Sequence, residues 1–150
     1  MPSKKSKIIK YDIDIDFNII GISYNKSIIS LCHKLNKALN IQLRKSSVSL
    51  NNTLCYSDKI ESIDIYYNYN EISRTLHCLM NNYNNPLFII QNLKDINLLL
   101  LIKTPDNFDI SQTVNSIKNI DNILFATIID KSLIKNTVLI NIIIENVNNQ

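Results

Sequence analysis

The alternation of apolar and polar positions predicts a strand near the amino terminus, followed by a helix. From Tyr11 to Ile19 every second residue is apolar or aromatic, which is typical of a strand with one buried face. The alternation slips at Ile20, just before Gly21, so we expect a bulge or close packing there. Apolar residues spaced three and four apart then predict a helix over 26–39. Its expected buried stripe is Ile28, Leu31, Cys32, Leu35, Ala38 and Leu39.

Polar residues mark the ends of this helix. Asn25 is the expected N-cap, with Tyr24 and Ile29 placed for a hydrophobic staple. Asn40 suits the left-handed residue that often follows a helix.

The middle of the chain has the pattern of strands. Alternation predicts strands over 61–67 and 75–80 with a turn near 68–70, and the preceding 47–58 reads as a loop with weak strand character. Two further strands are expected over 87–90 and 96–103. The second is apolar on both faces, as in a central strand.

A second helix and two apolar segments follow. Asp109 and Gln112 have the spacing of a capping box before a helix over 110–120, with Val114, Ile117 and Ile120 as its buried stripe. Residues 122–129 read as another central strand, and 138–147 have strand composition.

The order of these elements predicts an α+β fold. Two helices are expected on one face of a mostly antiparallel sheet, in a ferredoxin-like arrangement. A basic tail over 1–10 is expected to precede a single domain over 11–140, with an extension over 141–150.

Composition narrows the classes of function. Gly21 is the one glycine among 150 residues, which excludes the glycine-rich loops that hold phosphates. Heavy use of Ile, Asn and Lys indicates an AT-rich coding sequence, as in reduced bacterial genomes. Four lysines and no acidic residue lie among the first ten positions, and the other residues hold 12 basic and 13 acidic side chains. The body of the protein is therefore not a basic nucleic-acid surface.

The cysteines and apolar runs predict a cytoplasmic location. Cys32, Cys55 and Cys78 are odd in number and lack C-x-x-C spacing, which favours reduced thiols. The basic start leads into no apolar signal region, and the apolar runs are too short for the roughly 20 residues of a spanning helix.

Three aspartates and two Cys–His pairs are candidates for metal chemistry. Asp12, Asp14 and Asp16 project from one strand face and could share a divalent cation, but the solvated face of a strand is the favoured explanation of them. The pairs Cys32-His33 and His77-Cys78 cannot each chelate one zinc, because neighbours on a helix or strand diverge. We interpret them as core cysteines beside partly exposed histidines.

Aromatic and basic residues offer a possible RNA contact. Tyr66, Tyr67 and Tyr69 could stack on bases, and the tail could meet phosphates. A half-buried sheet for the tyrosines and a solvated terminus for the lysines are the favoured interpretation. The basic residues of the tail are Lys4, Lys5, Lys7 and Lys10.

Several segments resemble the IPExxxVDY proteins, a small bacterial family without an established activity. "DFNIIGIS", "LCHKLNKAL", "LKDINLLLLIK" and "ILFATIIDKSLI" match the family's layout over most of 10–140. The signature proline, glutamate, aspartate and tyrosine fall on Gln91, Asn92, Asn97 and Leu98, which favours a turn between strands over an acidic site. The matching positions are Gly21, Ile22, Ser23, Leu31, Cys32, Leu35, Asn36, Ile90, Leu93, Lys94 and Ile96.

The sequence therefore favours a non-enzymatic domain that binds a protein, without a cofactor. The apolar segment 138–144 could pair with a partner or with a second copy in a homodimer. The alternatives are an RNA-associated accessory protein that uses the tail, and a divalent-metal enzyme built on the three aspartates.

Overall fold

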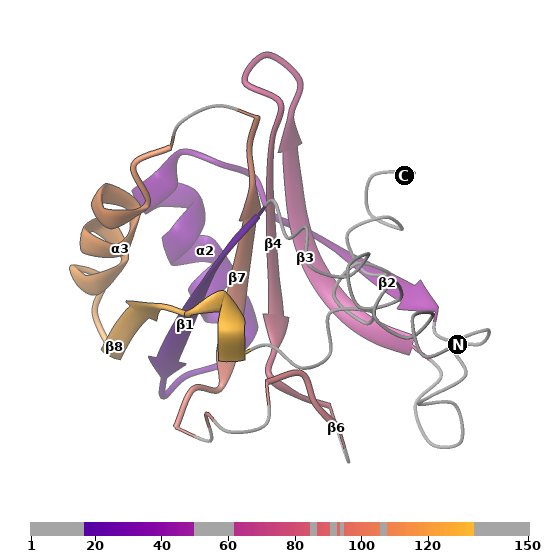
Figure 1. Ribbon diagram of the computed structural model, residues 1–150, viewed down its shortest axis with the longest axis vertical. Helices are drawn as coiled ribbons and strands as arrows, with labels where there is room; N and C mark the ends of the chain where they lie inside the picture. The colour runs from indigo at the N-terminus through magenta and orange to yellow at the C-terminus, as the bar shows by residue number, and fades with distance from the viewer. Residues whose placement is uncertain are drawn as a thin grey trace, which may run out of the picture.

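A computed structural model describes residues 17–49, 62–84, 87–90, 93, 95–105 and 108–133. Its centre is a six-stranded antiparallel sheet in the order β2-β3-β4-β7-β1-β8, and a short ribbon of β5 and β6 projects beside it (Figure 1). The elements are β1 Asn18–Tyr24, α2 Ile28–Leu39, β2 Arg44–Ser49, β3 Ser62–Asn70, β4 Thr75–Asn81, β5 Tyr83–Asn84, β6 Leu87–Phe88, β7 Leu98–Lys103, α3 Ile110–Lys118, β8 Ile123–Ile128 and the 3₁₀ helix η1 Lys131–Leu133.

Both helices pack on the same face of the sheet, which confirms the predicted α+β class. Leu35 of α2 and Ile117 of α3 join one buried cluster with Ile20, Ile22 and Leu100 from β1 and β7. Within the sheet, β8-β1-β7-β4 are connected through α2 and α3 in a way that suggests a ferredoxin-like core. The β2–β3 hairpin, inserted between α2 and β4, extends that core at one side.

The sheet is buried on both faces at its centre. Ile19, Leu99 and Leu101 point away from the helices into a second cluster, which also includes Ile65 and Ile90. Every residue of β7 from Leu98 to Ile102 is at most 1% exposed. The prediction of a central strand over 96–103 is therefore confirmed, with its hydrogen-bonded part beginning at Leu98.

The start of α2 differs from the predicted one. Ser27 caps the helix, because its Oγ accepts a hydrogen bond of 3.1 Å from the Ser30 N–H, so the prediction of Asn25 as N-cap was wrong. The expected staple is also absent: Ile29 is 56% exposed, and the buried Tyr24 instead places its hydroxyl 2.8 Å from Ser30 Oγ.

The other predicted helix ends agree better with the structure. Asn40 follows α2 in the left-handed region, with φ 56° and its N–H donated to the Asn36 carbonyl. Asp109 Oδ1 accepts from the Gln112 N–H at 3.3 Å and caps α3. Ala38 lies on the exposed side of α2, outside the buried stripe.

Two boundaries in the β-rich middle were wrong. The predicted loop over 47–58 begins inside β2, which pairs along β3 from Arg44 to Ser49. The turn between β3 and β4 occupies 71–74 rather than 68–70, because cross-strand pairing continues to Asn70 opposite Thr75.

Gly21 is explained by close packing and not by a bulge. It pairs in regular register with Leu99 and Thr127, and the irregularity in the β1–β8 pairing lies further on, between Ser23 and Tyr24. A Cβ at Gly21 would lie 2.6 Å from Ile96 Cδ1 and 2.7 Å from Ile129 Cδ1, closer than real Cβ atoms approach.

We expect Gly21→Ala to lower the free energy of unfolding by about 1–3 kcal/mol, because the new methyl group overpacks a filled core. Ile96→Val removes the Cδ1 atom that the methyl would meet, so the double variant should lose less than the sum of the single changes. Urea denaturation of the four proteins measures this coupling. Ile22→Val, on the opposite face of β1, is the matched control and should add without coupling. Strict additivity for Ile96→Val would contradict the packing explanation.

Candidate functional site

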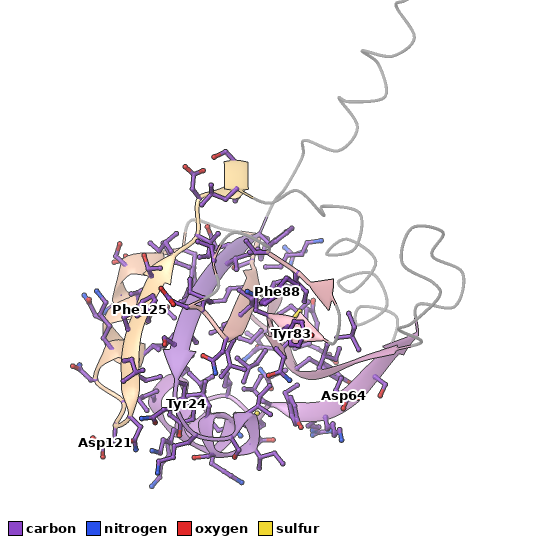
Figure 2. All side chains as sticks on the ribbon, turned by 90° about the horizontal axis from the view of Figure 1, so that it is seen from below. Tyr24, Asp64, Tyr83, Phe88, Asp121 and Phe125 are labelled. Carbon is purple, nitrogen blue, oxygen red and sulfur yellow. The ribbon has the colours of Figure 1, made fainter. Side chains whose placement is uncertain are left out.

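Within the described part of the chain, strand β8 forms an open, apolar edge of the sheet. Among the described strands it pairs with β1 alone, so the prediction of a central strand over 122–129 was wrong. An apolar strand is ordinarily buried, yet Leu124 is 65% exposed, Phe125 40% and Ile128 43%. Figure 2 shows Phe125 on the outer strand of the sheet, away from the core.

The backbone of β8 presents hydrogen-bonding groups at this edge. The Ile129 N–H donates to the Ile19 carbonyl at 2.8 Å, which fixes the residues whose groups point to β1. Because these groups alternate along an antiparallel strand, Ala126 and Ile128 direct their N–H and C=O away from β1. These outward N–H and C=O groups could form hydrogen bonds with an added strand.

The opposite edge, β2, is built differently. It carries Arg44 and Lys45, and the Lys45 ammonium lies 3.7 Å from a carboxylate oxygen of Asp64. Charged side chains on an edge strand hinder pairing with another chain, because their burial costs free energy. The six side chains of β8 include no charged one. Of the two edges, β8 is therefore the one suited to pairing.

The sequence-predicted metal and tail residues lie outside the described part of the chain. Within that part, no group of three or more His, Cys, Asp or Glu side chains could hold a metal ion. The predicted residues not described are Asp12, Asp14, Asp16, Lys4, Lys5, Lys7 and Lys10.

The three candidate stacking tyrosines do not share one face of β3. Tyr66 packs against the helix-side cluster, whereas Tyr67 packs against the cluster on the opposite face. Tyr69 follows Tyr67 by two residues and is 47% exposed. The three rings do not form one platform.

The two described cysteines are buried thiols. Burial raises the pKa of Cys32 to about 11 and that of Cys78 to about 12, so neither is an activated nucleophile near neutral pH. The expectation of partly exposed histidines holds for His33, but His77 is buried, with 9% of its surface exposed.

A buried asparagine that the sequence analysis did not single out organises the loop before β7. Asn82 is completely buried, and its Oδ1 accepts from the Ile90 N–H at 2.8 Å. Its Nδ2 lies 3.1–3.4 Å from the carbonyl oxygens of Ile90, Leu93 and Ile96. The Asn82 side chain thus satisfies backbone groups that a tight loop leaves unpaired.

Asn97, which the sequence comparison above aligned with the signature aspartate, also has a structural role. Its side chain accepts from the Tyr24 N–H at 2.9 Å and donates to the Tyr24 carbonyl at 2.8 Å. Its N–H donates to the Ile22 carbonyl at 3.2 Å. The side chain therefore continues the β1–β7 pairing beyond Leu98. Gln91, Asn92 and Lys94 lie outside the described residues.

Several of the other described positions of the family resemblance lie in the core or support it. Ile22, Leu31 and Leu35 are fully buried, and Asn36 Oδ1 accepts from the Leu43 N–H at 2.8 Å. A scan against models of protein families and a search of curated proteins found no match to this chain. Among the described residues, no helix has the length and apolar character needed to cross a membrane.

Proposed function

We propose that this protein is a non-enzymatic binding module that adds an extended strand of another protein chain to β8. The observation that carries this proposal is the open edge of β8, which combines outward backbone groups with exposed apolar side chains and has no charge of its own. Strand addition uses these features: backbone hydrogen bonds supply affinity, and alternate side chains supply specificity.

The surface defines the chemistry of the partner. An antiparallel strand would pair with the N–H and C=O of Ala126 and Ile128. Its side chains would meet Ile128 on the helix face, Phe125 on the other face, and Leu124 where the β1–β8 register shifts. A suitable partner is therefore an extended segment, apolar at its centre. As part of this proposal we place the protein in the cytoplasm, which the free thiols of Cys32 and Cys78 support.

A synthetic peptide with the sequence of residues 121–130 provides a suitable apolar strand. We expect it to bind the full-length protein in fluorescence anisotropy, and Leu124→Lys to weaken this binding by about tenfold, since the lysine must be desolvated at the edge. Ile72→Lys is the matched control, because Ile72 is 97% exposed on the distant β3–β4 turn and should leave binding unchanged.

Peptides methylated at alternate backbone nitrogens test whether hydrogen bonding along the edge is used, and they should not bind. Sedimentation velocity of the protein itself separates two sources of the strand. Self-association that Leu124→Lys abolishes would identify a second copy as the partner; peptide binding by a monomer would indicate a different protein. Failure of the protein both to bind the peptide and to self-associate would contradict the proposal.

A further inference from the structure

A polar patch lies on the helix face of the sheet, where the apolar core ends. Asn68 of β3 is directly opposite His77 of β4, and Asn70 is opposite Thr75. Thr104, just after β7, joins them, since its Oγ1 lies 3.2 Å from Thr75 Oγ1. Tyr66, Leu79 and Ile102 lie two residues away from Asn68, His77 and Thr104 on the same face of their strands. All three belong to the helix-side cluster or pack against it.

The residues of this patch line an open pocket of about 500 Å³. Its apolar lining includes Leu39 at the end of α2, Ile41 just after this helix, and Phe108 before α3. The β3–β4 turn, with Ile72 and Arg74, forms the rim. The turn and the carboxyl end of β7 lie at the same end of the sheet (Figure 1). Three segments that are far apart in the sequence thus line one pocket.

The described polar groups of the pocket are rich in hydrogen-bond donors. Asn68 Oδ1 accepts from the Gln42 N–H at 3.3 Å, and Asn70 Oδ1 accepts from the Ile72 and Ser73 N–H groups at 2.9 and 3.0 Å. Their amide NH₂ groups are left to donate elsewhere. The Arg74 guanidinium adds a positive charge, and none of the described lining residues is acidic.

His77 gives an independent indication of a binding site. It lines the pocket with 9% of its surface exposed, and its buried Nδ1 has no hydrogen-bond partner among the described residues. A buried polar atom without a partner costs about 1–3 kcal/mol, and a purely structural core position would favour an apolar residue. A histidine here is instead suited to contact a ligand that covers the patch.

We propose that this pocket binds a small organic anion with a flat apolar body. The anionic group, a carboxylate or a phosphate monoester, would meet the Arg74 guanidinium and the amide NH₂ groups of Asn68 and Asn70. The apolar body would lie between Ile41 and Phe108, above His77. This site lies on the helix face at one end of the sheet and is separate from the β8 edge, so its test is independent of the proposed strand binding.

Benzoate, phenyl phosphate and benzamide serve as probes. Benzamide has the shape of benzoate without its charge, so it tests the need for an anion. We expect benzoate or phenyl phosphate to bind in the millimolar range or tighter and to shift the NMR signals of the His77 imidazole and of the Ser73 and Arg74 amides. Benzamide should bind at least about tenfold more weakly, since it lacks the charge-assisted hydrogen bonds.

Arg74→Gln should weaken binding of the anions about tenfold, and Arg74→Lys should restore part of it. Arg44→Gln removes the same charge from β2, outside the pocket, and should leave binding unchanged. Arg74 is exposed, so these variants should stay folded.

The two anions distinguish the source of the negative charge. Preference for benzoate indicates a carboxylate ligand, and preference for phenyl phosphate indicates a phosphate ester. The proposal is overturned if neither anion binds at millimolar concentration, if benzamide binds as well as benzoate, or if Arg74→Gln and Arg44→Gln have the same effect.

Discussion

Asn82→Ala is expected to lower the free energy of unfolding by about 3–5 kcal/mol, enough to unfold a domain of marginal stability. The change removes the partner of the Ile90 N–H and of three carbonyl groups, one of them that of Ile96. These backbone groups would stay buried, so each would bear a desolvation cost that water cannot offset. Urea denaturation followed by circular dichroism measures the loss.

Asn115→Ala is the matched control for this prediction. Asn115 is exposed on α3, where alanine is the better helix former, so the same truncation should be neutral or slightly stabilising. If Asn82→Ala cost less than about 1 kcal/mol, the loop before β7 would not depend on this side chain.

Acidification from pH 6.5 to pH 4 is expected to destabilise the protein by up to about 3 kcal/mol through His77 alone. Burial lowers the pKa of His77 to about 4 in the folded protein, against an ordinary value of 6.5. Between these two values the unfolded chain binds a proton that the folded protein does not. Stability therefore falls as the pH drops through this range, and the loss is complete below the folded pKa.

His77→Leu isolates this contribution from that of the carboxylates. The variant should lack this part of the acid sensitivity and should be more stable than the parent at neutral pH by about 1 kcal/mol, since it removes a buried polar atom without a partner. Denaturation of both proteins at pH 7.5 and pH 4.5 gives the comparison. Equal acid sensitivity of the two proteins would show that His77 keeps an ordinary pKa.

Local patterns predicted the elements but not their places in the sheet. The run through Leu98–Ile102 is apolar on both faces, and the strand is central; the run through Ile123–Ile128 is nearly as apolar, and the strand is an edge. The difference depends on which strands pair with each other. Pairing between segments far apart in the sequence cannot be derived from the pattern of a single strand. For the same reason β2 was not predicted as a strand: its polar sequence suits an edge strand but resembles a loop.

The two buried polar residues Asn82 and His77 could not be identified from the sequence pattern either. Asn82 stands among Asn81, Asn84 and Asn85 in a segment that reads as a polar turn, and only the folded loop distinguishes it from them. His77 lies in a strand whose alternation correctly placed Leu76 and its successors on one face. The pattern gave no sign that the opposite face is also buried, so the environment of His77 could not be derived from it.

The most direct test of strand binding at β8 is amide hydrogen exchange with and without the peptide of residues 121–130. The proposal predicts that the outward N–H groups of Ala126 and Ile128 exchange rapidly in the free protein and slowly in the complex. The inward N–H groups of Phe125 and Thr127, which are already paired with β1, should change little. A bound peptide that leaves the exchange of Ala126 and Ile128 unchanged would contradict the assignment of β8 as the binding edge.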